Sequence, residues 1–508
     1  MASSLSSILL KNPFSVRSNI AANILANVAI AAIYFISVPL FVRYVGIEGY
    51  GLIGFFIFAQ GILSVLDLGL NVVLAREFAI RSDDDEEASR LHDILRTAEV
   101  FYWIAGIAIG LVWAAAAGLL GRFVNAEGLS GETVYQSFLI MAAVIALQMP
   151  VSLYSSALFG LQRQAAVSVV GVVFSLLRNL GVVAVLHFVS SAPQMFFGWQ
   201  LVCWILHVPV LIFLLKRSLP RSAEKPVFRA ELITGKWQFV AEIGVITLAA
   251  MLLMHVDKFV LARVVSLEAF GYYALAGVVA NGFHWLTQPV FRAVMPRLSQ
   301  LTHNDDRSTL SLLYHQSCQV LALIVFPIAG LWAYFSYELM KLWQQDAAIA
   351  AKTSVFVTLL VIGAAVSGVL LMPYALQIAF GRTRLQLVAV VAAFVVSVPL
   401  MIVAGTRWDG VGVAVVGITL NVGIVLFVVP LMHRRLLKGE ATGWLVNDIA
   451  LPALAVAATG AICRYFFVTS SQAIEVLQLI AAMIVMTLAV VASSTLARRW
   501  IAKRFGRH

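Results

Sequence analysis

The sequence predicts an all-α integral membrane protein with about 14 transmembrane helices. Hydrophobic residues make up 61% of its 508 residues and charged residues only 12%, which is about half the charged fraction of a soluble domain. A water-soluble core cannot absorb so many apolar residues, so lipid is the solvent that remains. The apolar runs are long and lack the alternating pattern of a barrel strand. Helices, which satisfy their backbone hydrogen bonds within each segment, are therefore predicted.

Apolar runs of at least the ~20 residues that cross a bilayer follow one another along the whole chain. Several are longer than a perpendicular span needs, which indicates tilted or kinked helices. The predicted spans are 18–42, 50–79, 98–121, 133–160, 165–190, 193–215, 237–262, 266–294, 311–337, 353–380, 385–406, 408–433, 446–463 and 473–497.

The distribution of lysine and arginine supports this count. If both termini lie in the cytoplasm, the loops and termini on that side carry 24 of the 35 basic residues and the opposite loops carry 7. Cytoplasmic loops of membrane proteins are enriched in lysine and arginine in this way. The sequence therefore predicts a multi-pass protein of the inner membrane with both termini cytoplasmic.

Composition also excludes several other readings. The net charge of +10 does not indicate nucleic-acid binding, because the basic residues lie in short loops where topology requires them. Cys203, Cys318 and Cys463 lie in apolar runs without paired spacing, so neither a disulfide nor a metal site is expected. The first residues lack the layout of a cleavable signal peptide, so the first span should remain a helix.

Short motifs recur at a constant offset along the chain. FVRYVGIEGYG at 41–51 matches LARVVSLEAFG at 261–271, and ALFGLQRQ at 157–164 matches IAFGRTRL at 378–385. Both pairs occur at equivalent ends of equivalent spans, so the repeat is parallel, with an axis along the membrane normal. Paired six-helix lobes suit alternating access, because a site between them can open to either side. The repeat therefore favours a transporter.

The repeat divides the chain into four regions. We expect an N-terminal six-helix lobe at 1–215, a cytoplasmic linker at 216–236, a C-terminal six-helix lobe at 237–433, and two extra helices with a basic cytoplasmic tail at 434–508. The linker is predicted from its length and from its six basic residues.

Arg178 is the candidate functional residue predicted to lie deepest in the membrane. It occurs near the middle of the fifth span, in SLLRNLGVV, and a charge at this depth costs about 2.5–3.5 kcal/mol on insertion scales. One interpretation is an anion-binding or coupling group in a central cavity. The alternative is a structural salt bridge.

Five further charged residues within predicted spans are candidates for substrate binding or coupling. Asp67 can carry an ion or a proton or pair with an arginine, and Arg76 can take part in the site or only mark the membrane interface. Asp257 and Lys258 are sequence neighbours whose side chains are expected on different faces, with an interfacial pair as the alternative. Arg292 can hold a phosphate at the cytoplasmic entrance or contact a lipid headgroup.

The motifs together resemble the polysaccharide transporter family. The resemblance extends over both lobes and places the chain in the superfamily of multidrug, oligosaccharidyl-lipid and polysaccharide exporters. The motifs are Pro39, Arg43 and Gly46 before EGYG, DLGL at 67–70 before Arg76, Asp257 before SLEAFGYYALA, PRLSQL at the end of the eighth span, and FGR at 380–382.

This resemblance implies a flippase rather than an enzyme. Such a protein moves an undecaprenyl-diphosphate-linked O-antigen or exopolysaccharide repeat unit from the cytoplasmic to the periplasmic leaflet. A guanidinium can compensate the diphosphate charge with two parallel hydrogen bonds. No cofactor is implied. The partners implied are the lipid-linked glycan and membrane lipids, with a polysaccharide polymerase and a chain-length regulator as further partners to consider.

Two alternative functions remain at this point. A multidrug or cation antiporter would share the fold, but the deepest predicted charge is an arginine, which disfavours organic cations. A membrane-embedded polysaccharide polymerase or ligase is an alternative from another class, although such enzymes usually carry a sizeable periplasmic loop. No Walker A motif is present in the sequence, so direct drive by ATP is not expected.

Overall fold

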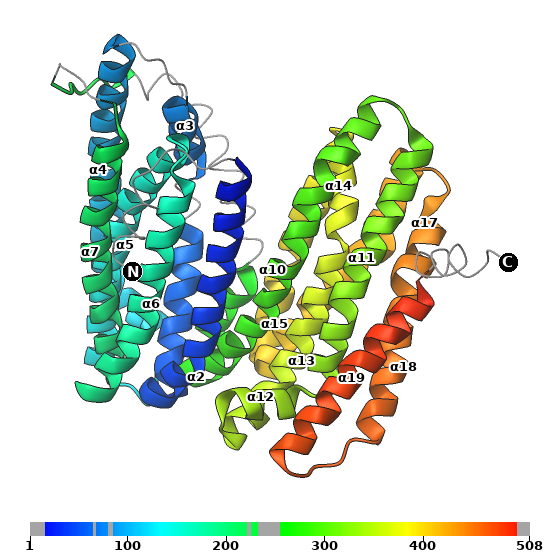
Figure 1. Cartoon of the computed structure of the whole chain (residues 1–508). Helices are drawn as coiled ribbons and strands as arrows, with labels where there is room; N and C mark the ends of the chain where they lie inside the picture. Colours follow the sequence, from blue (N-terminus) through cyan, green and yellow to red (C-terminus); the bar gives the residue numbers. More distant parts are fainter. Residues whose placement is uncertain (1–15, 64–67, 80–84, 221–224, 232–254, 495–508) are drawn as a thin grey trace. The chain divides into compact units, whose positions relative to one another are not determined.

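A computed structural model describes residues 16–63, 68–79, 85–220, 225–231 and 255–494, and these residues form helices joined by short turns (Figure 1). Ten helical segments among them are long and apolar enough to cross a membrane. The predicted fold class, an all-α membrane protein, is confirmed. The seventh predicted span, 237–262, lies mostly outside the described residues.

Two of these segments each contain two spans. The segment Leu25–Ile62 has 38 residues and Arg384–Leu436 has 53, so straight helices would be about 57 and 80 Å long, against a hydrocarbon core of about 30 Å. Non-helical residues interrupt both segments: Gly46, with φ 78°, in the first, and Trp408 and Asp409, with φ of −135° and 49°, in the second. Gly46 suits the positive φ because it has no side chain.

The chain divides into two compact units, each with its own core. The first contains the described residues up to His255 together with Ser266–Gly271, and the second contains Val256–Val265 and the chain from Tyr272 onward. The predicted lobe boundaries at 215 and 237 stay predictions, because residues 221–224 and 232–254 lie outside the described residues.

The helices of the first unit surround a core of leucine, phenylalanine, tyrosine and alanine side chains from α3 to α7. They are α2 (Val16–Leu63), α3 (Leu68–Ala79), α4 (Asp85–Phe123), α5 (Gly131–Gly160), α6 (Gln164–Phe188) and α7 (Pro193–Ser218).

Most of the chain's remaining helices belong to the second unit, where the largest buried side chain is that of Trp444. They are α10 (Leu267–His303, which begins in the first unit), α11 (Arg307–Tyr334), α12 (Ser336–Gln344), α13 (Ala347–Val369), α14 (Leu371–Ala379), α15 (Arg384–Gly423), η2 (Ile424–Val428), α16 (Val429–Leu436), α17 (Glu440–Gly443), η3 (Trp444–Ala450), α18 (Leu451–Tyr465) and α19 (Gln472–Ser493).

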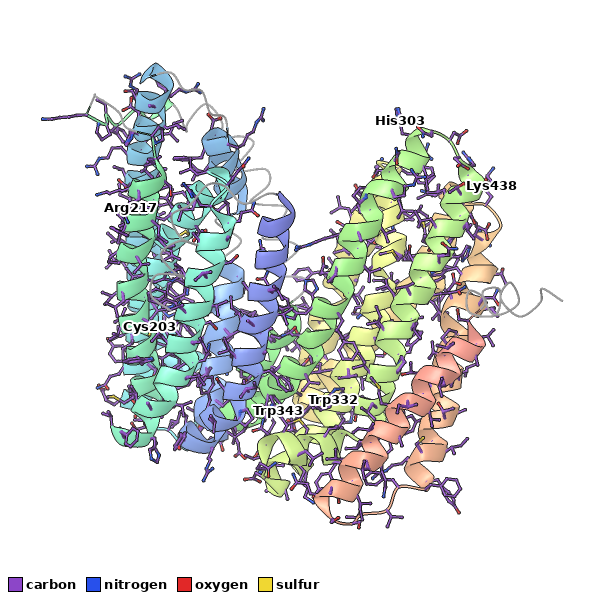
Figure 2. All side chains as sticks on the ribbon, in the orientation of Figure 1. Cys203, Arg217, His303, Trp332, Trp343 and Lys438 are labelled. Carbon is purple, nitrogen blue, oxygen red and sulfur yellow. The ribbon has the colours of Figure 1, made fainter. Side chains whose placement is uncertain are left out.

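Polar and aromatic side chains mark the two ends of the second unit. Figure 2 shows His303 and Lys438 at one end of this unit and Trp332 and Trp343 toward the other. The predicted loops assign His303 and Lys438 to the cytoplasmic side and Trp343 to the opposite side, and this sidedness stays a prediction.

Helix α11 begins at a well-defined cap. The side chain of Asp306 accepts a hydrogen bond from the backbone N–H of Thr309 at 3.1 Å. Hydrogen bonds from Thr309 and Ser308 hold the pKa of the Asp306 carboxyl below its usual range. A carboxylate at this position satisfies an N–H group that the first turn leaves free.

A close backbone contact explains the glycines of the repeated motif. Gly51 lies against the carbonyl of Leu267, so an added Cβ would be 2.5 Å from that oxygen, and Gly271 lies against the carbonyl of Ile47 in the same way. The N–H of Leu267 also donates to the carbonyl of Asn125 at 2.8 Å. The two motifs thus meet reciprocally, and only a residue without a side chain fits at either glycine.

Helix α4 begins before the third predicted span, and its first turns contact residues 227–229 of the predicted linker. Residues 85–97 continue the helix because Leu91, Ile94 and Leu95 recur at helical spacing and are buried. Asp93, 3% exposed, accepts from the backbone N–H of Val227 at 2.6 Å and pairs with Nε of Arg229 at 3.1 Å. The described part of the linker is therefore bound to α4.

We predict that Asp93→Ala releases the linker. The substitution removes the acceptor for Val227 and Arg229, and hydrogen bonds to a charged group contribute about 1.5–3 kcal/mol, so local opening should rise at least ~10-fold. Limited trypsin digestion of the purified protein measures this as faster cleavage after Arg229. Asp305→Ala is the control, because that carboxylate is exposed and pairs with Arg307. Equal cleavage rates in the two variants would contradict the prediction.

Candidate functional site

Arg178 lies in the contact between α6 and α7, among aromatic rings. Its guanidinium carbon is 4.8 Å from the centre of the Trp204 ring. Its Nη1 is 3.5 Å from Nδ1 of His207, and the His207 ring stacks on Phe174 with 4.2 Å between centroids. The side chain is thus only partly exposed and is held by one face of an indole.

The salt-bridge interpretation of Arg178 finds no support in the described residues, among which no carboxylate forms an ion pair with it. A desolvated cation–π contact contributes about 2 kcal/mol, which offsets much of the ~2.5–3.5 kcal/mol cost of inserting an arginine. Stacking on Trp204 can therefore keep this cation at membrane depth while its positive charge stays available to an anion.

Asp257 and Lys258 form an ion pair with each other in the helical segment 255–264. The Lys258 Nζ is 3.1 Å from Oδ2 of Asp257, and the Tyr273 hydroxyl donates to the same oxygen at 2.8 Å. Adjacent helical residues point in different directions, but the flexible lysine stem reaches back. The geometry is that of the predicted interfacial pair, and a role for either residue in substrate binding stays a prediction.

Three further predicted site residues are Asp67, Arg76 and Arg292. Asp67 lies outside the described residues, Arg76 is exposed in the last turn of α3, and Arg292 is exposed on α10. These positions fit the alternatives of an interface marker for Arg76 and a headgroup contact for Arg292. Their functional roles stay predictions.

A polar cluster that the sequence analysis missed joins α3, α4 and α5. Asn71 donates from Nδ2 to the Ser152 hydroxyl at 2.8 Å, and its Oδ1 accepts from Ser156 at 2.7 Å and Tyr102 at 3.2 Å. One carboxamide thus connects all three helices. Asn71 follows the DLGL motif, and its position in an apolar run was the signal available in the sequence.

The same face of α4 continues this cluster with aromatic and charged groups. Tyr154 donates to Oε1 of Glu99 at 3.1 Å, Trp103 Nε1 donates to Tyr154 at 3.4 Å, and Arg96 lies 3.7 Å from Glu99. Tyr102 and Tyr154 are each 2% exposed and belong to the core of the first unit. The cluster from Asn71 to Arg96 therefore joins α3, α4 and α5 by polar contacts inside that core.

The sequence analysis also missed a buried network in the second unit around His315 of α11. Asp448 of η3, 1% exposed, and Glu440 of α17 both contact its imidazole ring. Asp448 falls within the thirteenth predicted span, so an acid inside an apolar run was again the available signal. Within the described residues, no group of three or more His, Cys, Asp or Glu side chains is arranged to hold a metal ion.

Comparison with known families identifies the chain. Residues 40–346 match the family described as "Polysaccharide biosynthesis protein". The chain belongs to this family. A protein of Shigella flexneri named "Putative O-antigen transporter" is 20% identical to this family member over 304 residues, which cover 59% of this chain and 70% of that protein. The polysaccharide transporter family predicted from the motifs is confirmed.

Solved structures share the fold of this family member. The inward closed conformation of the lipid II flippase MurJ has a TM-score of 0.71 at 13% identity and covers 94% of this chain and 99% of its own. An inward-facing multidrug resistance MATE transporter of the MOP superfamily has a TM-score of 0.63 at 13% identity, with coverages of 80% and 96%. At these identities the likeness establishes the fold.

We predict that Asn71→Ala destabilises the first unit. The substitution removes three interhelical hydrogen bonds. The buried hydroxyls of Tyr102 and Ser156 lose this partner, which lowers the free energy of unfolding by about 1–3 kcal/mol for each hydroxyl. The thermal midpoint of the detergent-purified protein should fall by several degrees. Asn27→Ala is the control, because the side chain of Asn27 bonds to Asn23 of its own helix at 2.7 Å and to no other helix among the described residues. Equal midpoints for the two variants would show that the cluster does not hold these helices together.

Proposed function

We propose that this family member is a flippase for polyprenyl-diphosphate-linked saccharides. It moves the repeat unit from the cytoplasmic to the periplasmic leaflet by alternating access, for assembly of O-antigen or exopolysaccharide. The saccharide and the diphosphate cross within the protein, and the polyprenyl tail stays in lipid. No covalent bond is formed or broken, so no catalytic residue or cofactor is required.

The observation that carries the proposal is the match to the polysaccharide biosynthesis family over residues 40–346. The fold shared with a lipid II flippase supports it, and so does the distant relative named as an O-antigen transporter. Substrates of this class combine a diphosphate, a saccharide and a long apolar tail. Moving such a substrate requires a polar route through a hydrocarbon layer, which packed helices can enclose.

Arg178 is proposed to bind the diphosphate during translocation. The diphosphate carries charge that hydrocarbon cannot solvate, and a guanidinium offers two parallel N–H donors to phosphate oxygens. Trp204 holds the guanidinium by one face, 4.8 Å away, and Nη1 lies 3.5 Å from Nδ1 of His207. The other N–H groups of the guanidinium are proposed to bind the phosphate oxygens. The absence of a carboxylate partner for Arg178 among the described residues avoids competition with the anionic substrate.

The setting of this activity is proposed to be the bacterial inner membrane, with both termini in the cytoplasm. Lipid-linked saccharides are assembled on the cytoplasmic leaflet and polymerised outside it. A polysaccharide polymerase and a chain-length regulator would then receive the flipped repeat unit. A multidrug antiporter is the alternative function, because a MATE transporter shares the fold.

We predict that Arg178→Ala and Arg178→Glu abolish translocation while Arg178→Lys retains part of it. Lysine keeps the positive charge but loses the paired donors that bind two phosphate oxygens. The cellular assay measures protein abundance in the membrane, surface polysaccharide and accumulated lipid-linked intermediate. Because no buried carboxylate is left unpaired within the described residues, abundance of the alanine variant should stay within about twofold of the wild type.

Asn179→Ala is the matched control, since Asn179 lies beside Arg178 and, within the part of the chain that the structure describes, its side chain bonds only to Ser175 of its own helix. It should support normal polysaccharide. Normal polymer from Arg178→Ala at normal abundance would remove Arg178 from the mechanism. Loss of abundance in that variant would instead assign Arg178 a structural role.

The predicted sidedness has its own test. A reporter that functions only in the cytoplasm should be active when it is inserted after Lys225, an exposed residue of the predicted linker. The high density of basic residues in this segment predicts that it lies in the cytoplasm. A second fusion at Asp346, in the turn before α13, should report the periplasm. Periplasmic activity at Lys225 would contradict the topology and with it the direction of translocation.

A further inference from the structure

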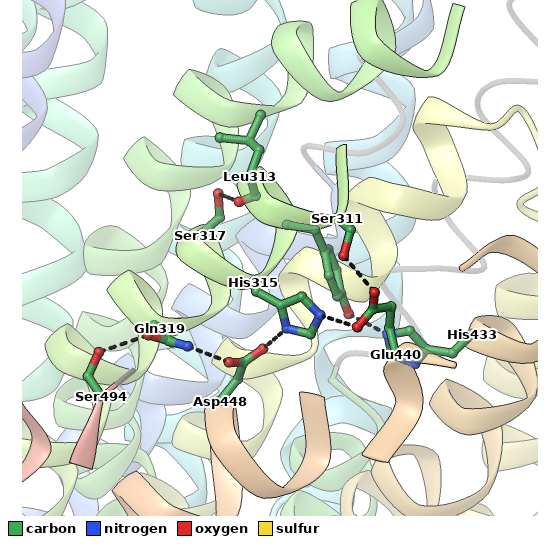
Figure 3. A network of polar contacts seen from close by, with 10 residues as sticks. Ser311, Leu313, His315, Ser317, Gln319, His433, Glu440, Asp448 and Ser494 are labelled. Atoms are coloured by element: carbon green, nitrogen blue, oxygen red, sulfur yellow. Dashed lines mark hydrogen bonds and ion pairs between the residues drawn. The ribbon is translucent and has the colours of Figure 1, made fainter. Parts of the chain in front are cut away.

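His315 lies between two carboxylates near the start of α11 (Figure 3). Its Nδ1 contacts Oδ2 of Asp448, and its Nε2 is 3.1 Å from Oε2 of Glu440. Asp448 belongs to the π-helical segment η3 and Glu440 opens α17. Both elements lead into α18, so this single imidazole connects α11 to the C-terminal helices.

Hydrogen bonds from neighbouring side chains fix both carboxylates. Ser311 donates to Oε1 of Glu440 at 2.8 Å, and Nε2 of Gln319 donates to Oδ1 of Asp448 at 2.7 Å. With those oxygens occupied, the remaining oxygen of each carboxylate is directed at the imidazole. The carboxylates therefore present one acceptor to each ring nitrogen.

The network also reaches the end of α19. The hydroxyl of Ser494, directly after that helix, donates to Oε1 of Gln319 at 2.8 Å. The C-terminal helix pair α18–α19 is thus bonded to α11 at the start of one helix and at the end of the other. Short π-helical segments within α-helices recur at functional sites, and η3 is the segment that places Asp448 here.

This geometry requires a proton. A neutral imidazole has one N–H and one lone pair, whereas an imidazolium has two N–H donors. Both nitrogens of His315 face carboxylate oxygens, so with both carboxylates ionised only the charged ring satisfies both contacts. Loss of one proton would set a ring lone pair against a carboxylate lone pair in a low-dielectric region, which is unfavourable.

Among the described residues, the ion pairs of these two carboxylates are both with His315. His433 of α16 bonds the carbonyl of Val429 and the hydroxyl of Tyr314, each at 3.0 Å, and a neutral ring satisfies both. Cys318, one turn beyond Tyr314 on α11, is buried and uncharged as a thiol.

Exposure decreases along the three groups. The side chain of Glu440 is 38% exposed, that of His315 20%, and that of Asp448 1%. Water can therefore reach the outer carboxylate, while the inner one is enclosed. This order permits a proton to enter through Glu440 and pass to the imidazole.

We propose that Glu440, His315 and Asp448 form a proton-binding site, and that the shared proton holds the C-terminal helix pair against α11. The ligand is a single proton exchanged with water at this end of the helices. When it is lost, the contact between α11 and the segments α17 and η3 loosens. This site does not rest on the proposed transport function and can be tested on the purified protein.

Cys318 provides a built-in reporter of that contact. It is 4% exposed and belongs to the same buried cluster as Trp444, so it should react with a maleimide only when the helices separate. Cys203→Ser and Cys463→Ser make it the sole thiol of a chain with three cysteines. The full-length protein in lipid nanodiscs is labelled over a pH series.

Thiolate formation alone raises the maleimide labelling rate tenfold per pH unit. We expect the labelling rate of the wild type to rise more steeply than this. Glu440→Gln is the decisive variant. Its carboxamide can donate to Nε2 of a neutral His315 while Nδ1–H donates to Asp448, so both contacts are kept without the extra proton. The labelling rate of the Glu440→Gln variant should rise only tenfold per pH unit. At the highest pH of the series, the wild-type labelling rate should be at least ~10-fold higher than that of the variant.

Infrared difference spectroscopy provides a second readout. Infrared difference spectra between acidic and alkaline pH should contain a histidine deprotonation band that His315→Gln removes and His303→Gln keeps, since His303 lies at the exposed end of α10. Identical labelling profiles for the wild type and Glu440→Gln would overturn the proposal. If His315→Gln does not fold, the comparison between the wild type and Glu440→Gln still decides it.

Discussion

A hydrocarbon layer offers no hydrogen-bond partner, so every polar group in a spanning segment must find one inside the protein. The backbone groups find hydrogen-bond partners by forming helices, whereas each polar side chain needs a partner of its own. Asn71 is satisfied by three hydroxyls from two other helices. Asp448 is satisfied by an imidazole and a carboxamide. Arg178 rests on an aromatic face. These solutions are the features of the fold on which the functional proposals rest.

The same constraint explains how the two C-terminal helices are held. At one end, the His315 network bonds α17, η3 and the end of α19 to α11. At the other end, Arg464 pairs with the buried Glu338 at 2.6 Å. Between these ends, Gly330 of α11 leaves room for Val456 and Met486 of the helix pair. Polar contacts thus fix the register of the pair at both ends, while small and apolar side chains let the helices approach closely.

Hydropathy and charge distribution were sufficient to predict the fold class, because span length and loop charge are properties of local sequence. They also identified Arg178 as a deep charge. Partners could not be predicted, because the contacting residues lie far apart in the chain: Ser494 and Gln319 are 175 positions apart. Asp257 and Lys258 show a second limit of prediction from sequence. Helical geometry predicts that their side chains point to different faces of the helix, but the flexible side chain of Lys258 reaches Asp257 and forms an ion pair at 3.1 Å. The helical extension at 85–97 was hidden by its acidic residues, although Leu91, Ile94 and Leu95 keep helical spacing.

Movement of a lipid-linked saccharide across a bilayer is the activity that we propose for this polysaccharide-family protein. It can be measured with the purified protein in proteoliposomes that contain a fluorescent polyprenyl-diphosphate saccharide, by following the fraction in the outer leaflet that an added impermeant quencher reaches. We expect exchange between leaflets at least ~10-fold faster than in protein-free liposomes, and no accelerated movement of a cationic dye. Exchange no faster than in protein-free liposomes, together with ion-driven transport of the dye, would contradict the proposal and favour the multidrug antiporter.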